Sequence, residues 1–94
     1  MRRFHGALFT LSVGVKIQNN LTNKPHFACV VSKKVALHAV ERNRIRRLAK
    51  ESFRAACTDI SGSSALVFYA KKEAKTAPFK AIDADIRKLL SNVQ

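Results

Sequence analysis

The spacing of the apolar residues changes along this 94-residue chain, and the change limits the folds that it can adopt. Between residues 7 and 17 apolar side chains occupy the odd positions, a period of two that predicts a half-buried strand. Between residues 40 and 57 they recur at steps of three and four, which is typical of an amphipathic helix. The predicted helix face comprises Ile45, Leu48, Ala49, Ser52, Phe53 and Ala56.

Three further segments complete the predicted architecture. Residues 26–32 are a nearly continuous apolar run, expected to form a central strand paired with the first in an antiparallel hairpin, and residues 65–70 predict a third, buried strand. Thr76 is the expected cap of a final helix with Pro78 in its first turn. Its apolar stripe would comprise Phe79, Ile82, Ile86, Leu89 and Val93.

The predicted order is therefore β-β-α-β-α. This order favours an α+β sandwich of two layers, in which two helices cover one face of a three-stranded sheet and the other face stays partly open. The length, the 47% of hydrophobic residues and the scarcity of Gly and Pro indicate one folded domain over residues 1–94. Cys29 and Cys57 lie in apolar contexts without metal-ligand spacing, so we expect reduced core thiols.

The charge of the chain indicates its class of partner. Lys and Arg number 18 against 6 Asp and Glu, a formal net charge of +12 that repels itself unless a polyanion compensates it. The chain has no apolar run of about 18 residues, and its first 14 residues do not resemble a signal peptide. We therefore expect a cytoplasmic protein that binds nucleic acid and no membrane.

Half of this net charge lies between residues 33 and 54, a segment that contains eight basic residues and two acidic ones. The alternative to a binding surface is that these charges form an ordinary solvated helix face. However, like charges four residues apart destabilise a helix, and cations at its start oppose the helix dipole, so this helix needs an anion. Guanidinium groups match the geometry of phosphate. The candidate residues are Lys33, Lys34, Arg42, Arg44, Arg46, Arg47, Lys50 and Arg54.

Asn43 is the neutral residue among these arginines, and two roles for it remain open: bonding to the backbone near the helix start, or contact with an RNA group. The six acidic residues are scattered singly, and His5, His26 and His38 follow no catalytic or metal-binding pattern. The sequence therefore predicts neither a catalytic site nor a metal site in the protein itself.

Residues 32–54, SKKVALHAVERNRIRRLAKESFR, closely resemble the signature of the bacterial ribonuclease P protein family, whose centre is the Arg-Asn-Arg at positions 42–44. A weaker resemblance covers residues 9–90. The resemblance implies a strand-helix-strand crossover of left-handed sense, as in folds like the second domain of ribosomal protein S5. It also implies that the eight basic residues and Asn43 contact RNA.

By this resemblance the chain is the non-catalytic protein subunit of ribonuclease P. Its partners would be the catalytic RNA and precursor tRNA. The RNA would hold Mg²⁺ and cleave the phosphodiester bond. The 5′ leader of the tRNA would lie in a cleft of the sheet and stack on Tyr69 or Phe27. The alternatives are a small ribosomal or ribosome-associated protein and, less favoured without a dimerisation element, a DNA-binding module.

Two departures from the family pattern affect these expectations. The Gly that usually follows Ser-Lys-Lys-Val in the family is replaced in this chain. The segment Ala36-Leu37-His38 looks one residue longer than the common form. We expect the family's N-terminal helix to be absent, because the first predicted strand begins within ten residues of Met1, and we therefore expect one wall of the leader cleft to be missing. The resemblance further predicts that alanine at Arg42 or Arg44 weakens RNA binding and leaves melting unchanged.

Overall fold

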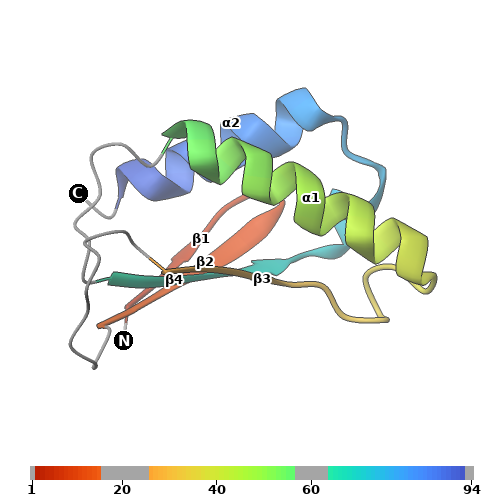
Figure 1. The fold of residues 1–94 in the computed structure, drawn as a ribbon, viewed down its shortest axis with the longest axis horizontal. Coiled ribbons are helices and arrows are strands. Elements are labelled where there is room, and N and C mark those ends of the chain that lie inside the picture. Colours follow the sequence, from red (N-terminus) through yellow and green to blue (C-terminus); the bar gives the residue numbers. More distant parts are fainter. Residues whose placement is uncertain (1, 16–25, 57–63, 93–94) are drawn as a thin grey trace.

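The computed structural model describes residues 2–15, 26–56 and 64–92. Within these residues the chain forms four strands, a short 3-10 helix and two α-helices (Figure 1). In chain order they are β1 (Arg2–His5), β2 (Phe9–Val15), β3 (His26–Val30), α1 (Ala39–Ala56), β4 (Ser64–Ala70), η2 (Lys72–Thr76) and α2 (Phe79–Ser91). The α+β sandwich of two layers is confirmed: both helices cover one face of a single sheet (Figure 1).

The strand order is β1-β2-β4-β3, with β2 antiparallel to both of its neighbours and β3 parallel to β4. The predicted hairpin of the first two long strands is therefore wrong, as is the central place predicted for β3, which lies at an edge. A continuous apolar run is typical of a buried strand, but it gives no information on whether both edges of the strand are paired.

Strand β1 has no counterpart in the sequence prediction. It is four residues long and contains two arginines, so it carries neither alternation nor an apolar run. It pairs with β2 from Arg2 opposite Val13 to His5 opposite Thr10. The residues directly before β2 thus form a strand and not a helix, and they widen the sheet on the side away from β3.

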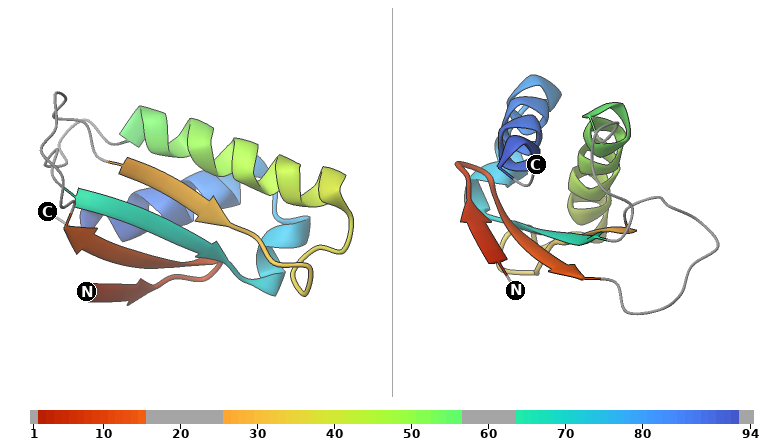
Figure 2. Two further views of the ribbon diagram at one scale, coloured as in Figure 1. Left: turned by 60° about the horizontal axis from the view of Figure 1, so that its bottom comes forward. Right: turned by 90° about the vertical axis from the view of Figure 1, so that its left-hand side faces the viewer.

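The β3-α1-β4 unit crosses over with left-handed sense. In the left view of Figure 2 the sheet faces the viewer, the helices lie behind it, and β3 and β4 run in the same direction. When these two strands point upward, β4 lies to the right of β3, and a crossover that passes behind the sheet toward the right is left-handed. About 98% of such units are right-handed, so the sense implied by the family resemblance is confirmed against the general rule.

The core lies between the sheet and the two helices. The predicted inner face of α1 is confirmed, because Ile45, Leu48, Ala49, Ser52 and Phe53 are buried. Phe68 of β4 lies at the centre of an aromatic group, with ring centroids 5.7 to 6.4 Å from those of Phe9, Phe27 and Phe53. The other large buried side chains are Phe9, Leu11 and Leu66 from the sheet and Ile82, Ile86, Leu89 and Leu90 from α2.

Helix α2 differs from its prediction at its start. Thr76 is the last residue of η2, and Pro78 takes the cap position of α2 without a side-chain cap. The reason is that the chain makes a separate 3-10 turn first, closed by the bond from Ala77 N to Ala74 O at 3.3 Å. Phe79, expected in the apolar stripe, is 42% exposed. The predicted stripe member Val93 lies outside the described residues.

Candidate nucleic-acid interface

The basic residues of α1 wind around the helix instead of lining one face. A step of four residues advances about 40° around an α-helix. Arg42, Arg46, Lys50 and Arg54 therefore run from the edge of the buried face to the solvent side: the first two are half-buried, and the last two are exposed. Their spacing of four in the sequence, which suggests a single basic face, therefore gives a stripe that turns around the helix. We define the basic outer face of α1 by the exposed residues Arg47, Lys50 and Arg54.

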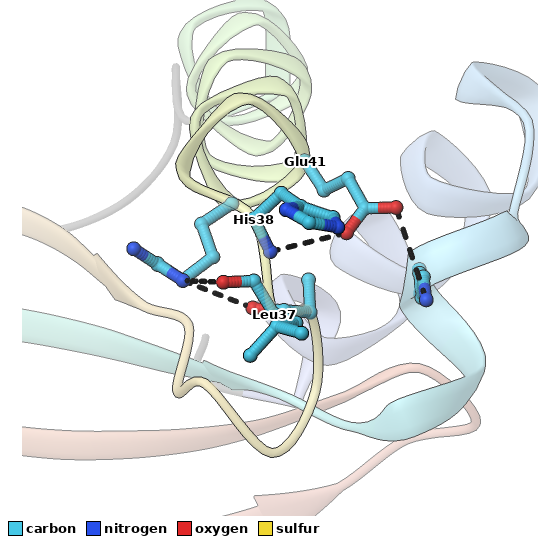
Figure 3. Close-up of polar contacts among 6 residues, drawn as sticks. Leu37, His38 and Glu41 are labelled. Atoms are coloured by element: carbon cyan, nitrogen blue, oxygen red, sulfur yellow. Dashed lines mark hydrogen bonds and ion pairs between the residues drawn. The ribbon is translucent and has the colours of Figure 1, made fainter.

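Arg42 turns back onto the chain that precedes α1. Its Nη1 donates hydrogen bonds to the carbonyl oxygens of Ala36 at 3.1 Å and Leu37 at 2.7 Å (Figure 3). Both carbonyls belong to the stretch that connects β3 with α1. A side chain from the first turn of α1 thus holds the backbone that leads into the helix.

Arg44 and Arg46 also have partners within the chain. Nη2 of Arg44 donates to the carbonyl oxygen of Ala77 at 3.3 Å, which ties α1 to the connection between η2 and α2. Nη2 of Arg46 donates to Oδ1 of Asn43 on the exposed side of α1. Asn43 therefore bonds to a side chain in this structure, a third role beside the backbone bond and the RNA contact left open by the sequence.

Lys33 and Lys34 lie in the turn between β3 and α1. The amides of Val35 and Ala36 donate to the carbonyl oxygen of Ser32 at 3.1 and 3.2 Å and close this turn. Both lysine side chains are exposed. They lie in the connection that leads into α1, whose N-terminus carries the positive end of the helix dipole, so positive charge concentrates at this end of the helix.

A shallow pocket lies on the solvent side of the first two turns of α1. It is lined by Val40, Asn43, Arg44 and Arg47. One wall is apolar, since Val40 is 78% exposed, and the others carry two guanidinium groups and an amide. Such a lining suits a ligand that presents both anionic and apolar parts, as a nucleotide does.

The sheet face away from the helices forms a second candidate surface. Cross-strand pairing places His5, Thr10, Tyr69 and Val30 in one row across all four strands. Tyr69 is 40% exposed on this face. Phe27 points to the other side and stacks on Phe53 with ring centroids 4.6 Å apart. The structure therefore corrects the expectation for Phe27, which belongs to the core, and leaves Tyr69 available for stacking.

Asp85 is a functional group that the sequence analysis missed. Its carboxylate is buried on the inner side of α2 and accepts three backbone hydrogen bonds from the turn between β1 and β2: from Ala7 at 2.9 Å, Leu8 at 3.1 Å and Phe9 at 3.0 Å. The sequence does contain a sign of this role. Asp85 lies at helical spacing between Ile82 and Leu89, so its carboxylate falls within the apolar stripe of the helix.

Asp83, two residues before Asp85 and on the other side of α2, joins the two helices at the surface. The Ser52 hydroxyl donates to its Oδ1 at 2.7 Å, and Nε of Arg87 donates to both carboxylate oxygens at 3.1 and 3.0 Å. The Ser52 hydrogen bond, aided by the hydrogen bond and charge of Arg87, lowers the pKa of the Asp83 carboxyl.

This lowered pKa predicts a pH dependence of stability. Since the folded protein holds Asp83 ionised more strongly than the unfolded chain does, its contribution is present above the ordinary Asp pKa of about 3.9 and is lost as pH falls through the lower folded pKa. The difference in free energy of unfolding between wild type and Asp83→Asn should therefore shrink when urea unfolding is repeated from pH 6 down to pH 3. A constant difference across that range would contradict the assignment; Glu73→Gln, in η2, is the control.

Cys29 is a free thiol that is only partly exposed. Burial raises the pKa of this thiol to about 12, and the nearby Arg46 charge offsets the effect only in part. The thiol is therefore neutral at physiological pH and a poor nucleophile. The prediction of a reduced thiol is confirmed for Cys29, whereas Cys57 lies outside the described residues.

Two other kinds of site have no candidate in the described part of the chain. Among residues 2–15, 26–56 and 64–92, no three His, Cys, Asp or Glu side chains lie close enough to hold a metal ion together. Within the same described portion, no helix has the length and apolar character required to cross a membrane.

The fold and the basic first turns of α1 define a class: a small α+β protein with a left-handed crossover whose helix carries the Arg-Asn-Arg signature. The family model for ribonuclease P matches residues 1–94. The chain belongs to the ribonuclease P protein family.

Relatives and solved structures agree with this assignment. The chain is 36% identical over 72 residues to the ribonuclease P protein component of Clostridium novyi and 42% identical over 74 residues to that of Clostridioides difficile. These matches cover 77% and 74% of this chain but 63% and 64% of the relatives, so the match spans somewhat less than two thirds of their length.

The fold matches solved ribonuclease P proteins. The Staphylococcus aureus protein superposes with a TM-score of 0.81, and that of Thermotoga maritima with 0.82. Each match covers 99% of this chain, and 81% and 84% of the respective structures, at 22% and 18% identity. At these identities the likeness establishes the fold alone.

Proposed function

We propose that this chain acts as the protein subunit of a bacterial ribonuclease P, in which it binds a catalytic RNA and assists removal of the 5′ leader from precursor tRNA. The observation that carries the proposal is the match of the family model across residues 1–94. The relatives named ribonuclease P protein component support the same role. A cytoplasmic location accords with it.

The basic outer face of α1 is the surface that we assign to the catalytic RNA. Arg47 and Lys50 are exposed side chains that form no hydrogen bond or ion pair with another described residue, so they are available to phosphate. Cations that neutralise phosphates release counterions and so supply most of the affinity for an RNA backbone. Arg54 completes this face, Lys33, Lys34 and Arg46 extend it, and Asn43 and Arg44 contribute through the pocket beside Val40.

In this proposal the RNA subunit carries out the cleavage of the phosphodiester bond. A protein with a net charge of +12 attracts phosphate and repels divalent cations, so Mg²⁺ is expected to bind where RNA phosphates gather and to act there on the phosphodiester bond. The protein would contribute by lowering repulsion between catalytic RNA and precursor tRNA. It would thereby reduce the Mg²⁺ concentration that cleavage requires.

The open sheet face is the surface that we assign to the leader. Single-stranded RNA is bound by stacking of its bases on aromatic rings beside positive charge. Tyr69, with Val30 next to it in the same row, offers such a platform, and Arg3 lies one row away on the same face. Phe27 is not part of this platform because it packs in the core.

The proposal is tested by cleavage at low magnesium. The purified chain is mixed with a bacterial ribonuclease P RNA and labelled precursor tRNA at a Mg²⁺ concentration at which the RNA alone cleaves slowly. We expect a faster release of the 5′ leader with an unchanged cleavage position. Tight binding of the RNA without any stimulation would overturn the role as a ribonuclease P subunit and leave an RNA-binding protein.

The RNA surface is tested by the double variant Arg47→Ala/Lys50→Ala. Loss of two phosphate contacts should weaken binding to the ribonuclease P RNA and reduce the slope of log K against log salt by about 1.5 to 2. Melting should stay within about 2 °C of wild type, since neither side chain packs in the core. The control Lys80→Ala/Lys88→Ala removes the same charge from α2; an equal loss there would mean that only net charge matters.

A further inference from the structure

Arg42 is the first arginine of the signature, yet its guanidinium is already used within the chain. Both Nη1 hydrogen bonds go to consecutive carbonyl oxygens, those of Ala36 and Leu37, at 3.1 and 2.7 Å (Figure 3). A guanidinium that bonds two carbonyls in fixed geometry is held by charge-assisted bonds and loses the freedom to follow a phosphate. This distinguishes Arg42 from Arg47, whose side chain is exposed on the outer face.

The carbonyls that Arg42 holds belong to the stretch 32–38, which leads from β3 to α1. Val31 and Ala36 are buried and anchor the backbone on either side of the lysine turn. Beyond Ala36 the stretch is exposed, and two side chains from the first turn of α1 secure it (Figure 3). Oε1 of Glu41 accepts a hydrogen bond from the His38 amide at 3.3 Å, and Arg42 donates to the carbonyls.

We propose that Arg42 is a positioning residue, which acts on RNA through the turn that carries Lys33 and Lys34 and not as a phosphate ligand. The inference rests on the RNA-binding function proposed above. Only Val35 separates Lys34 from the carbonyl of Ala36, so fixing that carbonyl fixes the direction in which both lysines leave the backbone. A fixed backbone reduces the ordering cost that flexible lysine side chains add to binding.

The first test needs no RNA. Hydrogen exchange of the Val35 and Ala36 amides, which both donate to Ser32, reports how often the turn opens. In Arg42→Ala these amides should exchange at least about tenfold faster, because the charge-assisted bonds that hold the Ala36 and Leu37 carbonyls next to the turn are lost. Arg42→Lys keeps the charge but replaces the planar guanidinium, whose Nη1 reaches both carbonyls, with an ammonium on a shorter stem. Its exchange rate should fall between those of the wild type and the alanine variant, and it also serves if the alanine variant does not fold. Arg47→Ala is the control and should exchange like wild type. Unchanged exchange in both Arg42 variants would overturn the positioning role.

The second test is a thermodynamic cycle measured as binding to a bacterial ribonuclease P RNA at fixed salt. Arg42→Ala and the pair Lys33→Ala/Lys34→Ala should each weaken binding about five- to tenfold. If Arg42 acts through the lysines, adding Arg42→Ala to the lysine pair should cost less than about twofold more. If the fold-losses in affinity of Arg42→Ala and of the lysine pair multiply in full, Arg42 is a direct phosphate ligand and the proposal is overturned.

The outcomes separate this inference from the function on which it rests. Arg47→Ala, a direct contact in the proposed surface, should multiply with the lysine pair. Normal binding by both Arg47→Ala and the lysine pair would reject the RNA surface, and with it any effect of Arg42 on RNA, whatever the exchange experiment shows. A wild-type chain that fails to bind the RNA would reject the proposed function itself.

Discussion

Replacing Asp85 with alanine should lower the free energy of unfolding by about 3 to 5 kcal/mol. The carboxylate receives the amides of Ala7, Leu8 and Phe9 at 2.9 to 3.1 Å, and its loss leaves three donors beside an apolar core. Urea unfolding followed by circular dichroism measures the effect. Asp83→Asn on the same helix is the control, since that carboxylate lies at the surface, and an equal loss in both variants would contradict the role given to Asp85.

Gly6 provides an independent check on Asp85. A Cβ at this position would lie 2.6 Å from Oδ1 and 2.7 Å from Oδ2 of Asp85, so a side chain at position 6 and the buried carboxylate exclude each other. Gly6→Ala should therefore destabilise the wild type markedly and the Asp85→Ala variant far less. Equal effects in the two backgrounds would show that the glycine is required for another reason.

Phe68→Ala should have an effect of similar size, a loss of about 3 to 5 kcal/mol in the free energy of unfolding. Phe68 is fully buried and contacts Phe9 and Phe27 of the sheet and Phe53 of α1. Its removal leaves a cavity between the two layers that these three rings cannot fill. The matched control is Phe79→Ala, which removes a partly exposed ring and should cost much less. A large loss in the control and a small one at Phe68 would place the core elsewhere.

The sequence predicted those parts of the fold in which one periodic pattern has one structural meaning. The alternation before Val15 and the helical spacing from Ile45 to Phe53 identify elements whose buried sides are confirmed. Strand order was not accessible in the same way, because the apolar run at residues 26–30 is compatible with an edge strand as well as with a central one. The left-handed crossover came only from the family resemblance, since general rules favour the opposite sense.

The candidate site was predictable in composition and less so in geometry. The stretch from Lys33 to Arg54 correctly located the helix and the turn where positive charge gathers. It could not reveal that Arg42 and Arg44 bond to backbone carbonyls, because those partners depend on the path of the preceding segment and of the η2-α2 connection. For the same reason, the expectation that alanine at either position leaves melting unchanged does not follow from the structure.

The hydrogen bonds of Asp85 also have a consequence for the order of folding. They join residues 76 to 78 positions apart in sequence, and β2 finds its partner β4 only after the whole β3-α1 segment has intervened. Contacts of such long range slow folding, because a large loop must close before any of them forms. Helix α1 makes its own bonds locally and can form early, so the first strands of the chain are expected to be among the last to reach their native places.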